Sequence, residues 1–363
     1  MRSAVKTFLF SISLSLLLLS LMYSAGHMNR VQDSLIRFVA RQRLGSTHNE
    51  LLDLQQMSVV LCGTGDPVPD RDRAAACTAV FAAGQFFLVD SGPSSARNAG
   101  VFALPLPDLT AVLLTHFHSD HIGDLGEINT QSWIAGRNHP LPVYGPPGVK
   151  QVVDGFASAY RLDAGYRAAT VPVLSPQTWM MEPHAIVIPG SAQQTGATTV
   201  LEGKGLRITA FTVDHAPVAP AYGYRFDYRG RSVVISGDTA KSSNLIRAAA
   251  DADLLIHEAQ AKHIISIIQQ VAGEESNKLL QQTLGDIQRY HSSPAEAAEV
   301  ANEAAVRLLV MSHLTPPQSG VLARWAFLRG VSAIRPRGVE LGYDGMMIAL
   351  PVNSHEIRVG RFK

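Results

Sequence analysis

The chain has 363 residues, of which 46% are hydrophobic and 17% are charged. This composition supplies enough apolar material for a large core and too little charge for a disordered chain, and the length does not force two domains. The formal net charge of +1 excludes a strongly cationic surface. A nucleic-acid partner would therefore need a local basic patch, and the sequence has no dense run of Lys and Arg to provide one.

The N-terminus has the pattern of an export signal. Arg2 and Lys6 precede an uncharged stretch over 8–23 that is rich in Leu, Ile and Ser, and small residues follow at 24–26. The stretch is shorter than the ~20 residues that comfortably span a bilayer, and Tyr23 lies beside the cleavage position. We expect residues 1–26 to be a signal peptide that directs the chain to the periplasm or the medium, with an uncleaved membrane anchor as the alternative.

Residues 27–56 and 57–363 form the next two predicted segments. Spaced apolar residues such as Val31, Leu35 and Phe38 among charges predict a helical linker over 27–56, and a hydrolase domain over 57–363 follows. The sequence has only two cysteines, Cys62 and Cys77. They could form a disulfide in an oxidising compartment or remain buried thiols, and a thiolate metal site is excluded because no cysteine cluster exists.

A repeated pattern organises the hydrolase domain, because several apolar strands end at a His or Asp. The predicted strands over 111–115, 206–213, 232–235, 253–256 and 308–311 lead to the following residues in turn: His116, Asp214 with His215, Asp238, His257 and His313. Ligands in α/β proteins gather where strand ends open into loops, so one shared site is expected. A capping box, Ser293 with Glu296, predicts a scaffold helix that extends to residue 306.

The hexamer His116-Phe117-His118-Ser119-Asp120-His121 has metal-ligand spacing. Just after a strand, His116 and His118 would project to the same side, where two imidazoles can bind one ion at ~2.0 to 2.1 Å. The turn that follows directs Asp120 and His121 toward a second ion. A chance cluster of histidines is the alternative, and the density of ligands in six residues favours the metal site.

The sequence resembles the metallo-β-lactamase superfamily, and within it the ribonuclease Z and arylsulfatase-like branch. The resemblance covers residues 59–351 and includes the hexamer. The other motifs that carry it are Gly63-Thr64-Gly65, Val89-Asp90-Ser91-Gly92, Val143-Tyr144-Gly145-Pro146, His215 before Tyr222-Gly223-Tyr224, Ser236-Gly237-Asp238-Thr239, His257-Glu258-Ala259 and Ser312-His313. The implied fold is α/β, a four-layer αββα sandwich of two packed mixed β-sheets flanked by helices.

The resemblance also implies a binuclear metal site. Its implied ligands are His116, His118 and His215 for one ion, Asp120, His121 and His313 for the other, and Asp238 bridging both. Imidazole and carboxylate ligands suit two Zn²⁺ ions, with Mn²⁺ or Fe as alternatives. A bridging carboxylate offsets the repulsion between two cations ~3.5 to 4 Å apart.

The bridging Asp238 separates this chain from true β-lactamases, which resemble the hexamer but have Cys or His at that position. The branch with the bridging Asp typically cleaves phosphoesters or sulfate esters, so a small phosphodiester or sulfate ester is the predicted substrate. The tRNA-clamping arm of ribonuclease Z would have to lie between Tyr224 and Asp238, where the sequence leaves no room. We keep a ribonuclease Z-like nuclease, a lactone or β-lactam hydrolase, and a metal-binding protein without turnover as alternatives.

Asp120 and His257 are the predicted catalytic residues. His257 ends the strand over 253–256, and both metals have their ligands by resemblance, so its imidazole would be free to protonate the leaving group. The alternative is that His257 only supports a metal ligand by a hydrogen bond. Glu258 would point to the other side of the strand and contact a loop or helix. Tyr222, Tyr224 and Arg225 either line the substrate pocket or pack within the sheet.

Overall fold

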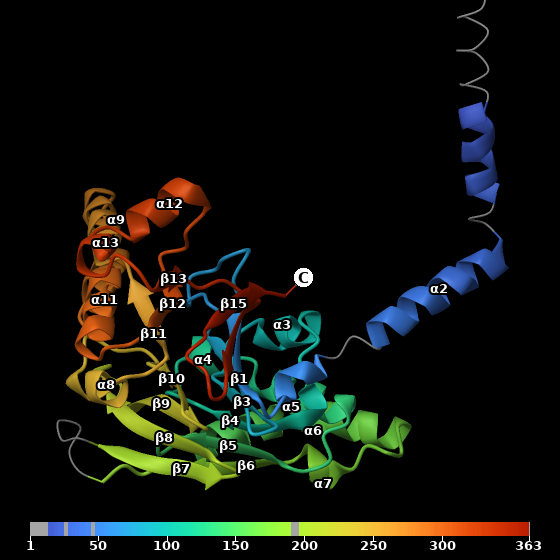
Figure 1. The fold of residues 1–363 in the computed structure, drawn as a ribbon, viewed down its shortest axis with the longest axis horizontal. Coiled ribbons are helices and arrows are strands. Elements are labelled where there is room, and N and C mark those ends of the chain that lie inside the picture. The colour runs from blue at the N-terminus through green and yellow to red at the C-terminus, as the bar shows by residue number, and fades with distance from the viewer. Residues whose placement is uncertain (1–13, 25–27, 45–47, 190–195, 363) are drawn as a thin grey trace, which may run out of the picture. The chain divides into compact units, whose positions relative to one another are not determined.

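The computed structural model describes residues 14–24, 28–44, 48–189 and 196–362 (Figure 1). The chain divides into two units, residues 1–48 and residues 49–363. The second unit begins at Asn49, before the predicted start at residue 57, because the short 3-10 helix η1 (Asn49–Leu52) buries Leu51 against the first sheet. Within the segment predicted as a linker, the structure has the helix α2 (Asn29–Leu44).

The predicted signal segment lies largely outside the described residues. Within it, residues 14–24 are helical, and residues 1–13 and 25–26 are not described. Among the described parts of the chain, no helix combines the length and the apolar character needed to cross a bilayer.

The first sheet has eight strands and is mixed, with the stretch from β3 to β6 parallel and the remaining pairs antiparallel. Across the sheet, the strands are β15 (Arg358–Arg361), β14 (Met346–Pro351), β1 (Gln56–Gly63), β2 (Cys77–Ala82), β3 (Gln85–Val89), β4 (Leu109–Leu113), β5 (Leu141–Gly145) and β6 (Met181–Ala185).

The second sheet has seven strands, parallel from β10 to β13 and antiparallel from β7 to β10. Across the sheet, the strands are β13 (Val339–Leu341), β12 (Leu308–Thr315), β11 (Leu254–Gln260), β10 (Arg231–Ile235), β9 (Ala221–Tyr228), β8 (Leu206–Val213) and β7 (Ala197–Gly203).

Helices cover the outer face of each sheet (Figure 1). Beside the first sheet lie η2 (Leu106–Asp108), α3 (Ser95–Val101), α4 (Ser119–Ile122), α5 (Leu125–Ala135), α6 (Val149–Thr170) and α7 (Pro176–Trp179). Beside the second lie α8 (Ser243–Ala248), α11 (Pro294–Glu303), α12 (Gly320–Phe327) and α13 (Val331–Ile334), with the helical pair α9 (Lys262–Glu274) and α10 (Lys278–Ile287). The predicted capping box of α11 is present, with both Ser293 and Glu296 bonds made.

Strand alternation divides the apolar residues among three cores. In β11, Ile256 faces the core between the two sheets, whereas Leu255 faces the helices outside the second sheet. Tyr222 and Tyr224 belong to the inter-sheet core, and their hydroxyls donate to the carbonyls of Ile186 and Leu114. These tyrosines therefore pack within the sandwich, and the predicted αββα architecture is confirmed.

Candidate metal centre

The predicted ligands converge at one edge of the sandwich, where strands of both sheets end. The strand β4 leads to His116 and His118, and the short helix α4 supplies Asp120 and His121. From the second sheet, β8 leads to His215, β10 leads to Asp238, and β12 contains His313. Because β8, β10 and β12 run in the same direction, their carboxyl ends open toward the hexamer.

Two local irregularities of the backbone in the second sheet orient the side chains of His313 and Asp238 toward the other ligands. The pairing of β11 with β12 shifts register at His313, which has a φ of 47°, so this residue leaves the ladder as in a β-bulge. Before Asp238, Gly237 has a φ of 61°, and a Cβ there would lie 2.6 Å from the Tyr222 carbonyl oxygen. Only glycine fits this position without displacing β9.

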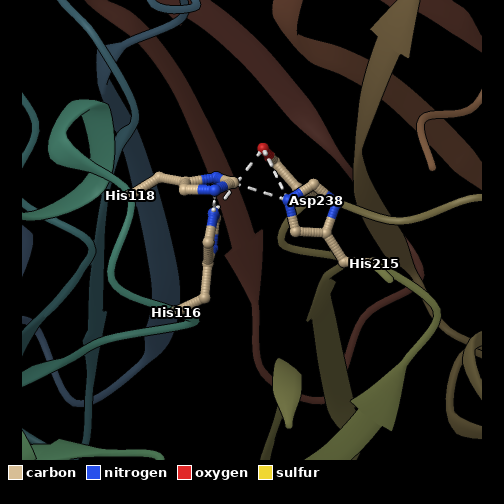
Figure 2. Close-up of side chains that lie close together, drawn as sticks. All are labelled: His116, His118, His215 and Asp238. Carbon is tan, nitrogen blue, oxygen red and sulfur yellow. Dashed lines mark hydrogen bonds and ion pairs between the residues drawn. The ribbon is translucent and has the colours of Figure 1, made fainter. Parts of the chain in front are cut away.

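The first ligand group consists of His116, His118, His215 and Asp238 (Figure 2). His116 Nε2 lies 2.9 Å from His118 Nδ1, which lies 3.4 Å from His215 Nε2. The Oδ2 atom of Asp238 lies 3.9 Å from His116 Nε2 and 4.0 Å from His215 Nε2. Three ring nitrogens and one carboxylate oxygen thus surround a single point.

The second ligand group consists of Asp120, His121, His313 and the same Asp238. His313 Nε2 lies 3.1 Å from Asp120 Oδ2 and 3.4 Å from Asp238 Oδ2. His121 Nε2 lies 3.5 Å and 3.3 Å from the same two oxygens. The Oδ2 atom of Asp238 therefore faces both groups, as the bridging assignment requires.

Both groups fit divalent cations. Four ligands at ~2.0 to 2.1 Å from a tetrahedral ion lie ~3.4 Å from one another. The distances in the second group, 3.1 to 3.5 Å, match this spacing, and those in the first group lie on both sides of it, from 2.9 to 4.0 Å. One of these ligand atoms, His121 Nε2, is also buried without a hydrogen-bond partner, as are the second carboxylate oxygen of Asp238 and the Nδ1 atom of His313. Buried polar atoms are rarely left without partners, so coordination accounts for His121 Nε2 in particular.

Hydrogen bonds from neighbouring groups hold the ligand rings in place. His121 Nδ1 lies 2.8 Å from Asp90 Oδ2, and His215 Nδ1 lies 3.1 Å from the Tyr290 carbonyl oxygen. Each contact is made by Nδ1 and directs Nε2 toward the ligand group. Thr115 donates to Asp90 from both its backbone and its hydroxyl group, and so fixes that carboxylate.

Comparison with known proteins identifies the family. A model of the β-lactamase superfamily domain matches residues 85–314. Ribonuclease Z of Mycobacterium bovis is 38% identical over 293 residues, which cover 79% of this chain and 96% of that protein. Ribonuclease Z of Mycolicibacterium paratuberculosis is 39% identical with the same coverage. The chain belongs to the metallo-β-lactamase superfamily, within its ribonuclease Z branch.

Solved structures of this superfamily share the fold. The short form of human tRNase Z has a TM-score of 0.59 and 20% identity, and the match covers 81% of this chain and 100% of that one. The metallo-β-lactamase fold protein YhfI from Bacillus subtilis has a TM-score of 0.56 and 21% identity, with 81% and 99% coverage. The chain is thus a metallo-β-lactamase superfamily hydrolase, and its described His and Asp clusters fit the divalent metal that this fold implies.

The three histidines of the first ligand group are neutral imidazoles, because burial lowers the pKa of each. Burial lowers the pKa of His116 well below its ordinary value, despite the opposing charge of Asp238. Burial also lowers the pKa of His118 and of His215. These three rings are therefore in the unprotonated form that a cation binds.

In the second ligand group, neighbouring carboxylates affect the pKa of the histidines more than burial does. Burial alone would lower the pKa of His121 and His313, but Asp238 and its neighbours outweigh it and raise the pKa of His121 well above its ordinary value. The pKa of His313 rises to about 9 for the same reason. In return, His121 and His313 hold the pKa of Asp120 and of Asp238 below the ordinary range, although burial opposes this. This group therefore holds protons that a cation must displace.

His291 is a site residue that the sequence interpretation missed. It lies between β11 and α11, and its ring centroid is 5.1 Å from that of His215 and 5.9 Å from that of His313. His291 Nδ1 lies 2.8 Å from Glu258 Oε1, which also accepts from the backbone of Thr239. Burial would lower the pKa of His291, but Glu258 raises it. His291 follows a helix rather than an apolar strand, so the strand-end pattern did not mark it.

The structure places His257 apart from this cluster. The side chain is fully buried, and Nδ1 lies 2.7 Å from the carbonyl oxygen of Glu258. Strand alternation puts His257 on the same face as Leu255, beneath the helical layer that includes α11. Glu258 takes the opposite face and reaches the loop that contains His291, as expected for a residue on the other side of the strand. This geometry argues against direct contact between His257 and a substrate.

A cavity of about 670 Å³ opens beside the first ligand group. His215 and Tyr290 lie at its metal side, and small apolar residues of the 216–219 loop form much of its wall. Asp214, Asp286 and Arg289 supply its charges. The cavity is large enough for a small organic group attached to an ester at the metal centre.

Proposed function

We propose that this hydrolase cleaves a phosphodiester bond of a small organic ester with two divalent cations, Zn²⁺ or alternatively Mn²⁺ or Fe. The observation that carries the proposal is the position of Asp238 Oδ2, which faces both ligand groups. Two cations held in this way would polarise a tetrahedral ester and supply an acidified water at neutral pH. A sulfate ester has the same tetrahedral geometry and is part of the test below.

We assign protonation of the leaving group to His291 rather than to His257. The Glu258 carboxylate accepts the Nδ1 proton of His291 and orients the ring between His215 and His313. Nε2 is then the atom that can hold a proton for the departing oxygen. Asp120 keeps the catalytic position predicted for it, because its Oδ2 faces His313 and His121 at the second ligand group.

Cleavage of RNA is the second candidate, favoured by the 38% identity to ribonuclease Z of Mycobacterium bovis. Two features argue for a small ester instead. The strands β9 and β10 form a direct hairpin at Arg229 and Gly230, so no clamping arm intervenes between His215 and Asp238. The charged residues that border the cavity are Asp214 and the ion pair of Asp286 with Arg289, so the cavity has no excess of positive charge for a polyanionic strand.

A substrate panel tests the proposal. The metal-reconstituted protein is assayed with an aryl phosphodiester, an aryl sulfate, a precursor tRNA, a lactone and a cephalosporin. We expect the aryl phosphodiester to have the highest kcat/KM among the small substrates and to exceed the precursor tRNA. Faster turnover of the precursor tRNA would establish the second candidate, and faster turnover of the cephalosporin would contradict phosphodiester cleavage altogether.

A matched pair of variants tests the proton donor. His291→Ala should reduce kcat by ~10² to 10⁴ for an alkyl leaving group and much less for p-nitrophenolate, because only the alkoxide requires a proton on departure. His257→Ala should either leave both rates unchanged or reduce them by the same factor. Metal content and Tm are measured in both variants as controls. A loss that depends on the leaving group in His257→Ala alone would return the role to His257.

We also propose that the chain acts outside the cytoplasm. Cys62 and Cys77 are joined as a disulfide, with their Cα atoms 5.0 Å apart. Such bonds persist in oxidising compartments, and the basic and apolar pattern of residues 1–26 fits export. A fusion of residues 1–26 to a reporter that is active only outside the cytoplasm should therefore be active. A reporter confined to the cytoplasm would contradict export.

A further inference from the structure

Helix α2 (Asn29–Leu44) has an apolar stripe along one side. Val31, Leu35, Phe38 and Val39 follow the i, i+4, i+7, i+8 spacing, so they share one side of the helix. Leu35 is 59% exposed and Phe38 is 60% exposed. A stripe of this kind normally packs on another surface, and a helix of 16 residues is only marginally stable in water without one.

The other side of α2 is basic. Arg30, Arg37 and Arg41 follow the i, i+7, i+11 spacing, share one side and are all exposed. The helix sequence contains four arginines and one acidic residue, Asp33. A surface that covers α2 must therefore have an apolar region for the aliphatic and aromatic side chains, and negatively charged groups beside it for the guanidinium groups.

The segment before α2 helps to decide which kind of surface covers the stripe of α2, a protein or a lipid bilayer. Within residues 14–24, which are helical, the exposed apolar side chains are Leu14, Leu16, Leu17, Leu18, Leu19, Leu21, Met22 and Tyr23. An apolar groove in a protein would accept the stripe of α2 but would bring no phosphate to its arginines. The interface of an anionic bilayer offers acyl chains to the stripe and headgroup phosphates to the arginines, and it also receives the segment before α2.

We propose that α2 lies in the plane of an anionic phospholipid bilayer, with Leu35 and Phe38 toward the acyl chains and Arg37 and Arg41 at the headgroups. The helix would then keep the hydrolase domain at a membrane surface, with or without cleavage of residues 1–26. This interaction is independent of the ester that the metal centre cleaves.

Flotation with lipid vesicles tests the apolar contact, and it uses the chain cleaved after residue 26, which is the mature form that the export signal predicts. Vesicles of phosphatidylglycerol and phosphatidylcholine should bind the wild type, and the double variant Leu35→Asp, Phe38→Asp should bind at least ~10-fold more weakly. The matched control is Leu322→Asp on α12, because Leu322 is also an exposed leucine, at 81%. Binding of the control should equal that of the wild type. Equal binding by the double variant, or equal loss in the control, would overturn the proposal.

Charge substitution tests the headgroup contact. Replacing Arg30, Arg37 and Arg41 by Gln should weaken binding to the anionic vesicles by roughly fivefold per arginine, and should not change binding to pure phosphatidylcholine. Loss on both vesicle types would show that the variant damages the helix rather than the electrostatic contact, and would contradict the assignment of the basic side.

Spin labels give a readout that holds even where the preceding segment alone retains the chain on vesicles. A label at Phe38→Cys should relax with lipid-soluble oxygen, and a label at Arg37→Cys should relax with a water-soluble nickel complex. These adjacent positions lie on different sides of the helix. Exposure of both labels to the nickel complex would overturn the proposal and indicate a helix free in solution, whereas shielding of both from either reagent would indicate a protein partner.

Discussion

The two ligand groups of the metal centre share one oxygen of Asp238 but are prepared in opposite ways. In the first group, burial keeps His116, His118 and His215 neutral, so a cation would bind there without displacing protons from these rings. In the second group, neighbouring carboxylates raise the pKa of His121 and His313, so those rings hold protons until a cation replaces them. Two candidate cation sites at one edge of the sandwich therefore differ in whether a cation would release protons on binding. The difference arises because more carboxylates surround the imidazoles of the second group than those of the first.

Removing the shared charge should have the largest effect. Asp238→Asn keeps the shape of the side chain but leaves two clusters of ligands without the anion between them. We expect metal content to fall from about two ions to one or fewer, and kcat/KM to fall by ~10² to 10⁴, the range for breaking a buried charge network. Elemental analysis and ester hydrolysis measure both quantities. A variant with two ions and wild-type rates would show that Asp238 is not the bridge.

Removing one imidazole from each group should separate the two sites. His215→Ala should lose one ion from the first group, and His313→Ala should lose one from the second, because each change removes a ligand that only one group contains. Titration with Co²⁺ would show the loss as one of two absorbing sites, with a different spectrum for the site that remains in each variant. Loss of both ions in both variants would mean that the groups bind metal as a single unit.

Removing a supporting group should have a smaller effect that is confined to one site. Asp90 holds the ring of His121 from the side opposite the ligand cluster. Asp90→Asn should weaken metal binding at the second group by ~10- to 100-fold, the usual cost of losing such a partner, and should leave the first group unchanged. Competition with a chelator measures the affinity of each site. Equal weakening at both sites would contradict the separation.

The smallest effect is a pH dependence of stability with opposite signs in the two metal states. In the chelator-treated protein, the proton on His313 stabilises the fold fully below pH 6.5, and this stabilisation is lost as pH rises through about 9. The Tm should therefore fall over this range. In the metal-loaded protein the same proton competes with the cation, so the Tm should rise. Scanning calorimetry at matched pH values measures the two slopes, and slopes of the same sign would contradict the assignment.

Sequence reasoning predicted the metal centre better than the groups around it. Each predicted ligand lies at or near the end of an apolar strand or within the hexamer, so local pattern and family resemblance predicted the residues, including His116 and Asp238, that the structure brings together in two groups able to hold metal ions. The disulfide between Cys62 and Cys77 was left open because spacing alone does not set the distance between two strands. The strands were predictable because their apolar pattern is local, and their arrangement in two packed sheets was implied by the family resemblance.

The error concerned side-chain direction within β11. His257 ends the predicted strand, and adjacency in sequence suggested that it reaches the metals. In the structure β11 continues to Gln260, so alternation turns His257 toward the outer helices and gives Glu258 the inner face. The partner of Glu258 is His291, which follows a helical pair in the sequence and approaches the metal centre only through tertiary packing. No local pattern measures that approach.

The central claim is that Asp238 lies between two cations, and anomalous diffraction from a crystal of the metal-loaded protein tests it most directly. We predict two anomalous peaks ~3.5 to 4 Å apart. One peak should lie within coordinating distance of His116, His118 and His215, the other within coordinating distance of Asp120, His121 and His313. Both should contact the Asp238 carboxylate. A single fully occupied peak, or two peaks of which only one contacts Asp238, would contradict the account.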